Sequence, residues 1–154
     1  MQLSANFALR EFIRTSTGLP NQPGMEAIEN LQWLCTTVLQ PLRDHLGKPV
    51  HITSGYRSRE VNAKVGGSKS SAHMRGLAVD CKVGIPQPWD AFSLLRVIWD
   101  LELPLDQAIG YAPARGGHVH LGISKRGSPL RGEYLYAPAH GGYLPWMPSP
   151  GSMR

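Results

Sequence analysis

The chain has 154 residues, of which 16 are Lys or Arg and 11 are Asp or Glu, so its formal net charge is +5 at pH 7. A chain of this length favours one domain that buries enough apolar surface to be stable without disulfides or an obligatory partner. Charged residues interrupt its apolar runs well before the roughly 18 positions that a transmembrane helix requires, so no membrane span is expected.

Hydrophobic spacing predicts the elements of the first part of the chain. Apolar side chains recur every three or four residues across 25–46, which predicts a helix with one buried stripe, ended by Gly47. Pro41 lacks a backbone N–H and is expected to kink or split this helix. The other elements predicted here are a short apolar element at 7–13, a loop at 15–24, a strand at 50–53 and a short helix at 58–65.

Three strands are predicted in the second part of the chain. In the first, at 77–83, the odd-numbered residues are apolar and share one face. Asp80 therefore points to the opposite face. The other two strands are predicted at 107–111 and 118–123, separated by a Pro and Gly-rich turn.

A helix and a tail complete the predicted organisation. Pro88 fits the first turn of a helix that ends before Pro104, and its expected buried stripe consists of Trp89, Phe92, Leu95, Ile98 and Trp99. Residues 125–154 are rich in Gly and Pro without periodicity, which predicts an extension that wraps the surface or is partly disordered. Strands and helices do not alternate regularly, so 1–124 is predicted to be an α+β domain with helices packed on a small, mostly antiparallel sheet.

Charge and cysteine content narrow the classes of partner. The basic residues are scattered, with no aromatic ladder or recognition-helix pattern, so nothing specific indicates nucleic-acid binding. The positive charge is compatible with another anionic partner, such as an acidic cell-wall polymer. Cys35 and Cys81 are expected to be buried, reduced thiols. Residues 1–12 lack the features of a secretory signal, so we expect synthesis in the cytoplasm, and no pattern indicates an oligomeric state.

Five residues are candidates for chemistry: Arg57, His73, Asp80, His118 and His120. A zinc ion held by two imidazoles and one carboxylate, with a fourth position open, is the usual arrangement of a catalytic zinc site. His118 and His120 are two apart on a predicted strand, so their side chains leave the same face. Spacing alone also allows structural histidines, a turn-capping Asp80 and a solvated Arg57.

Three motifs together resemble the M15 family of zinc peptidases, which includes D-alanyl-D-alanine carboxypeptidases and phage endolysins. They are the Ser-x-His-x-x-Gly-x-Ala-x-Asp pattern at 71–80, Ser-Gly-Tyr-Arg at 54–57 and His-Val-His at 118–120. The likeness covers about residues 6–133 and is strongest to short single-domain members from phages and prophages. It implies the fold that these peptidases share with the hedgehog signalling domain.

The resemblance also implies a site and a substrate class. It assigns His73, Asp80 and His120 to a Zn²⁺ ion and Arg57 to the carboxylate or carbonyl of a cell-wall peptide. Ser71 is expected either to orient substrate or to cap a turn. The implied activity is hydrolysis of amide bonds in peptidoglycan peptides, next to D-alanine, by a protein that acts at the bacterial cell wall.

The chain departs from the family where the general base is expected. Many members have an acidic residue three positions before the last ligand, where this chain has Gly117, and related short members have a Glu where it has Tyr111. His118 could replace the base, since an imidazole suits proton transfer at neutral pH. Asp106 is a second candidate. A third reading is a non-catalytic, zinc-containing module that binds the cell wall or belongs to a virion.

Overall fold

The computed structural model describes residues 1–149. Its helical segments are α1 (Arg10–Ile13), α2 (Met25–Leu34), the π-helical turn η1 (Cys35–Leu39), α3 (Gln40–Leu46), α4 (Arg59–Lys64), the 3-10 turn η2 (Ala72–Arg75), α5 (Ala91–Asp100) and the 3-10 turn η3 (Pro113–Arg115). Its strands are β1 (Gln2–Ser4), β2 (Phe7–Ala8), β3 (Val50–Ser54), β4 (Ala78–Val83), β5 (Gln107–Tyr111), β6 (Val119–Gly122), β7 (Glu133–Ala137) and β8 (Leu144–Pro145).

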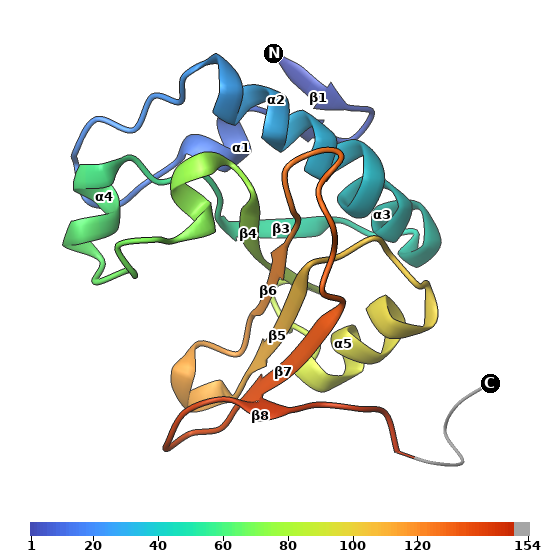
Figure 1. The fold of residues 1–154 in the computed structure, drawn as a ribbon. Helices are drawn as coiled ribbons and strands as arrows, with labels where there is room; N and C mark the ends of the chain where they lie inside the picture. Colours follow the sequence, from blue (N-terminus) through green and yellow to red (C-terminus); the bar gives the residue numbers. More distant parts are fainter. Residues whose placement is uncertain (150–154) are drawn as a thin grey trace.

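Within the described residues, one six-stranded sheet forms the centre of the fold, in the order β3-β4-β6-β5-β7-β8 (Figure 1). Neighbouring strands are antiparallel except β5 and β7, which are parallel. β1 and β2 pair separately. The prediction of an α+β fold with helices on a mostly antiparallel sheet is therefore confirmed.

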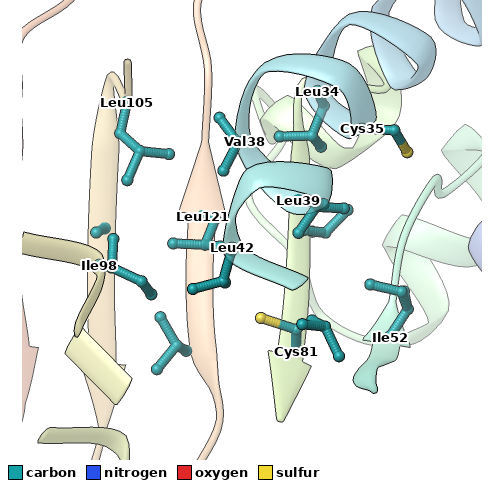
Figure 2. Packing of buried hydrophobic residues seen from close by; sticks show 14 of the residues in the cluster. Leu34, Cys35, Val38, Leu39, Leu42, Ile52, Cys81, Ile98, Leu105 and Leu121 are labelled. Carbon is teal, nitrogen blue, oxygen red and sulfur yellow. The ribbon is translucent and has the colours of Figure 1, made fainter. Parts of the chain in front are cut away.

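The hydrophobic core lies on one face of the sheet. The apolar residues of β4 are buried there, and α2, η1, α3 and α5 cover them. Figure 2 shows helical side chains of this cluster, among them Leu34, Val38, Leu39 and Leu42, packed near Leu121 and Cys81 of the sheet. Because side chains alternate along a strand, Asp80 is carried on the opposite face, as predicted. Asp80 lies there with His73 and His120, which are described below.

Pro41 divides the long predicted helix. The segment is α-helical to Leu34, widens into the π-helical turn η1 and continues as α3, with Pro41 in its first turn. A proline has no N–H to donate and its ring crowds the carbonyl four residues earlier, and a wider turn just before it relieves both problems. Gly47 ends α3 with φ 65°, as expected for a left-handed C-cap.

The predicted start of the next helix was wrong. α5 begins at Ala91 because Asp90 caps it, its carboxylate accepting the backbone N–H groups of Phe92 and Ser93. Phe92 was expected in the core but is 37% exposed, and its ring contacts Tyr136 of β7 at 4.6 Å between centroids. The buried residues of α5 are Ala91, Leu94, Leu95 and Ile98.

The segment after residue 124 contributes two strands that no periodicity indicated. β7 pairs with β5 along its whole length, and β8 pairs with β7 at the edge of the sheet. Tyr134 and Trp146 pack with Trp99 of α5, so this segment also covers the helix. Residues 150–154 of the predicted extension lie outside the described residues.

Two further expectations concern the thiols and the membrane. Cys35 and Cys81 are buried and unpaired, as predicted, and burial raises the pKa of Cys81 to about 12. Among residues 1–149, no helix has the length and hydropathy needed to cross a bilayer.

Asp106 anchors the loop that leads into β7. Its carboxylate accepts the backbone N–H of Arg131 at 2.9 Å and two guanidinium N–H groups at 3.1 and 2.7 Å. These hydrogen bonds lower the pKa of Asp106 below its usual range. Since Arg131 is 60% exposed, solvent screens the pair, and we expect Asp106→Asn to lower the free energy of unfolding by about 1 kcal/mol at pH 7.

The sign of the pH dependence follows from the lowered pKa. A carboxyl group whose pKa is lower in the folded state adds stability above its unfolded pKa of about 3.9 and loses that contribution as pH falls through the folded value. Thermal unfolding at pH 7 and pH 3 should therefore show a difference between the parent and Asp106→Asn that shrinks in acid. Asp100→Asn, which removes the surface pair with Arg96, is the control and should have the smaller effect at pH 7.

Candidate metal centre

Three side chains from separate elements meet on the polar face of the sheet. His73 comes from η2, Asp80 from β4 and His120 from β6, and Asp80 and His120 are direct partners in the strand register. Each offers one ligand atom, and these atoms all lie within 4.8 Å of one another. Asp80 Oδ1 is 3.0 Å from His120 Nδ1 and 3.4 Å from His73 Nε2. The three residues predicted as ligands are thus brought together.

Two backbone segments fix the ring of His73. Its Nδ1 lies 2.8 Å from the carbonyl oxygen of Gly55, so Nδ1–H donates there and Nε2 is directed toward Asp80. The His73 carbonyl accepts the backbone N–H of Arg57 at 3.1 Å. Ser71 caps η2, since its Oγ accepts the backbone N–H of His73 at 3.2 Å. Residues of the Ser71 and Ser54–Arg57 motifs therefore both help to position His73.

The donor set fits a zinc ion. Zinc binds imidazole nitrogen and carboxylate oxygen at about 2.0–2.2 Å in tetrahedral geometry, which places neighbouring ligand atoms about 3.4 Å apart. The separations around Asp80 Oδ1 are close to this value. A metal-ligating histidine almost always donates its second N–H to a carbonyl or carboxylate, and His73 does so to Gly55.

Asp80 is held in the form that binds a cation. Burial alone would raise its pKa, but hydrogen bonds from His120 and His73 and their positive potential outweigh burial, so its pKa lies well below the usual range. Its other oxygen, Oδ2, accepts from Arg57 Nη2 at 3.4 Å. The carboxylate is thus ionised at neutral pH.

Arg57 borders the three-residue group as a fixed, half-buried cation, which excludes the reading of a solvated side chain. Its Nε donates to Ser54 Oγ at 3.2 Å, its Nη1 to Asn62 Oδ1 at 3.3 Å and its Nη2 to Asp80 Oδ2. A guanidinium has five N–H donors, so these three bonds leave two for another molecule. Asn62 is 3% exposed and was not predicted as a site residue.

His118 lies at the more exposed rim of the same group. Its Nε2 is 3.9 Å from Asp80 Oδ2, and its side chain is 21% exposed, against 5% for His73. Burial lowers the pKa of His118, although the charge of Asp80 opposes this shift. The ring stacks on Tyr111 with 4.4 Å between centroids and 20° between planes. Burial therefore favours the neutral form of His118, and its Nε2 faces Asp80.

The two positions that lack a carboxylate have different physical characters. Gly117 has φ 68° and Gly116 has φ 112°, a region that side chains other than glycine rarely adopt. A Cβ at Gly116 would lie 2.8 Å from His118 Nδ1, so this turn leaves room for the His118 ring. Burial and the Tyr143 hydroxyl raise the pKa of Tyr111, so its phenol stays protonated and is not a base at neutral pH.

Asp106, the second candidate for the general base, is not part of this group. Its carboxylate is occupied by Arg131 at the opposite end of β5 from Tyr111. Two contributors were missed from the sequence: Asn62, which holds Arg57, and Tyr111, which stacks on His118. Asn62 lies on a predicted helix and follows Arg57 by five residues, a spacing that does not by itself indicate contact. Tyr111 is two residues after Ile109 on β5, so both side chains leave the same face of the strand, and this was the available signal for Tyr111.

Gly55 lets the chain approach α1 closely enough to place its carbonyl under His73. A Cβ on Gly55 would lie 2.5 Å from the Phe12 carbonyl oxygen and 2.6 Å from Phe12 Cα. We expect Gly55→Ala to cost about 1–3 kcal/mol of stability. Because the carbonyl that orients His73 must move, Zn²⁺ affinity should also fall by roughly 10–100-fold.

Thermal unfolding and a competitive Zn²⁺ titration measure both effects of Gly55→Ala. Gly24→Ala is the matched control, because nothing lies within 4 Å of its Cβ position. Its stability cost at the N-cap of α2 should stay below about 1 kcal/mol, and its Zn²⁺ affinity should be that of the parent. Unchanged Zn²⁺ affinity in a folded Gly55→Ala variant would contradict the role given to the Gly55 carbonyl.

Comparison with known proteins agrees with this geometry. No curated protein matches the chain. The sequence model of the family described as Peptidase M15 matches residues 5–121, which include the Ser-Gly-Tyr-Arg segment, His73, Asp80 and His120. The match covers well over half of the 154 residues, and His73, Asp80 and His120 within it form the group that could hold a metal ion. The chain therefore belongs to the Peptidase M15 family of metallopeptidases.

Proposed function

We propose that this protein is a zinc-dependent peptidase that hydrolyses amide bonds in peptidoglycan peptides, next to D-alanine, at the bacterial cell wall. The observation that carries the proposal is the His73–Asp80–His120 group. The Gly55 carbonyl orients the His73 ring, and Arg57 and His118 border the group. When bound by these three residues, zinc supplies a Lewis acid that lowers the pKa of water and polarises a peptide carbonyl.

Arg57 is assigned to substrate binding. Its two free N–H donors can bind the carboxylate or a carbonyl of the peptide, and its contacts with Ser54 and Asn62 hold the guanidinium plane in place. Ser71 is assigned to orienting the peptide, since its Oγ accepts from the His73 N–H and still has its own proton to donate. Rigid donors of this kind align the scissile bond before reaction.

His118 is assigned to proton transfer. Its Nε2 points toward Asp80, on the rim where a peptide can approach, and burial favours the neutral ring that accepts a proton. In this role Nε2 takes a proton from the attacking water and delivers it to the leaving amine. The assignment replaces the carboxylate that the family resemblance places at position 117 or 111.

A hollow whose wall includes Asn62, the hydrogen-bond partner of Arg57, can receive the rest of the peptide. It has a volume of about 850 Å³, within the range of roughly 300–1,000 Å³ usual for ligand sites, and Tyr56, Asn62 and Met74 form part of its wall. Arg59 and Lys69 are exposed on the same wall and add positive charge. Peptidoglycan peptides carry free carboxylates, and this charge favours such substrates over neutral ones.

A second function, a zinc-containing module that binds the wall or a virion without cleaving peptides, is favoured by one observation. Gly117 and Tyr111 supply no carboxylate where the family resemblance expects one, and Tyr111 stays protonated. This module should bind zinc and sediment with peptidoglycan without releasing new amino termini.

Digestion of purified peptidoglycan followed by mass spectrometry tests the proposal. We expect the zinc-loaded protein to release peptide fragments cut next to D-alanine and a chelated sample to release none. A casein digest is the control for general proteolysis and should stay uncut. Zinc-dependent cleavage of casein but not of peptidoglycan would contradict the proposed substrate, and binding without cleavage of either would favour the second function.

A further inference from the structure

The C-terminal segment contacts the rim of the candidate metal centre. The loop at 138–143 joins β7 to β8, and its start is tied to β5 by the Ala112 N–H, which donates to the Ala137 carbonyl at 2.9 Å. Tyr143 Oη is 3.3 Å from Tyr111 Oη. The loop therefore reaches the residue on which His118 stacks.

Arg115 connects this loop to Tyr111 a second time. Its guanidinium carbon lies 5.3 Å from the ring centroids of both Tyr111 and Tyr143, so the cation contacts both aromatic rings. Its Nη1, which has two N–H groups, lies 3.4–3.5 Å from the carbonyl oxygens of Pro138, Gly141 and Gly142. One cation thus ties three points of the loop to the two tyrosines.

The contacts of Arg115 and Tyr143 with Tyr111 matter because Tyr111 holds His118, which lies between a glycine turn and β6. The residue follows Gly116 and Gly117, which bear no side chains, and it precedes the first residue of β6. The Tyr111 N–H donates to the His118 carbonyl at 3.0 Å, and the Tyr111 ring covers one face of the imidazole. Tyr111 therefore restrains both the backbone and the ring of His118, with Nε2 directed toward Asp80.

We propose that Tyr111 is a positioning residue for His118, held in place by Arg115 and by Tyr143 of the loop at 138–143. The inference rests on the proposed role of His118 in proton transfer. Tyr111, Arg115 and His118 lie within the family match at 5–121, whereas the loop that carries Tyr143 lies beyond its end. In this proposal the loop between β7 and β8 helps to hold Tyr111, in addition to the packing of the C-terminal segment on α5.

The device should affect kcat and leave substrate and metal binding intact. A displacement of a catalytic group by about 1 Å can cost roughly 100-fold in rate, so we expect Tyr111→Ala to lower kcat by about 10- to 100-fold. KM and Zn²⁺ affinity should stay near parent values, because Arg57 and the three ligands are untouched. Tyr111→Phe keeps the stacked ring and should retain most of the activity.

A double-mutant cycle in the full-length, zinc-loaded protein tests whether Tyr111 acts through His118. We expect Tyr111→Ala to have no further effect on kcat once His118 is replaced by alanine. Equal losses in both backgrounds would overturn the proposal. Arg115→Ala and Tyr143→Ala should each lower kcat less than Tyr111→Ala, while Arg126→Ala, which removes a cation over Trp33 on α2, should leave kcat unchanged.

An NMR measurement tests the same geometry without activity. A ring stacked at 4.4 Å shifts the imidazole proton signals of His118 upfield, so Tyr111→Ala should move them downfield. Arg115→Ala and Tyr143→Ala should move them in the same direction, and Tyr134→Phe should not. Unchanged signals in the first three folded variants would overturn the proposal. If the parent protein cleaves no peptide but the shifts occur, the proposed function fails while the positioning device stands.

Discussion

Replacing His73 with alanine is expected to abolish zinc binding and peptide hydrolysis together. His73 supplies one of the three ligand atoms in the group. It is the single histidine of η2, so no neighbouring imidazole on that turn can replace it. Loss of an outer partner of a ligand costs roughly 10–100-fold in metal affinity, and loss of the ligand itself should cost more. Asp80→Ala should have the same effect and, in addition, leave Arg57 without its carboxylate partner.

Metal content by mass spectrometry and hydrolysis of peptidoglycan measure this result side by side. His45→Ala is the matched control, because His45 is an exposed imidazole on α3, in the helical layer. It should retain one zinc per chain and full activity. Thermal unfolding checks that the variants are folded. Hydrolysis that persists in folded, metal-free His73→Ala protein would contradict the assignment of the metal centre.

The second large effect is expected for His118→Ala, which should separate catalysis from metal binding. A general acid–base group contributes typically about 10²–10⁴-fold to the rate, so kcat should fall by that factor. His118 Nε2 is 3.9 Å from Asp80 and is not one of the three grouped ligand atoms, so zinc content should be unchanged. KM should also change little, because Arg57 and its partners remain.

Steady-state kinetics of zinc-loaded His118→Ala measure this separation. His118→Gln is the informative companion variant, since its amide can donate a hydrogen bond but cannot transfer a proton at neutral pH. It should be as slow as the alanine variant. If His118→Gln retained parent activity, His118 would act by hydrogen bonding and not by proton transfer, and loss of zinc in either variant would make it a ligand.

Part of the site could be predicted because it depends on local pattern. The alternation in β4 placed Asp80 on the face away from the core, and the Ser71–Asp80 motif identified His73. Asp80 and His120 meet because β4 and β6 are adjacent strands in which these two residues are direct partners. The exact start of α5 was missed because the cap at Asp90 outweighed the preference of Pro88 for a first helical turn.

The rest depends on contacts between distant parts of the chain. In β7 both faces are apolar, with Tyr134 and Tyr136 toward α5 and Leu135 on the other face, so no alternation of polar and apolar residues marks a strand. Its parallel pairing with β5 cannot be read from either segment alone. The same pairing brings Tyr143 to Tyr111, and neither the stack on His118 nor the Arg115 contacts has a local signature.

The most direct test is a titration of Zn²⁺ into metal-free protein, in which bound zinc and peptidoglycan hydrolysis are measured on the same samples. If His73, Asp80 and His120 form one catalytic centre, hydrolysis rises in proportion to bound zinc and saturates at one zinc per chain. Hydrolysis by the metal-free protein, or a saturated single site without hydrolysis, would contradict a zinc peptidase.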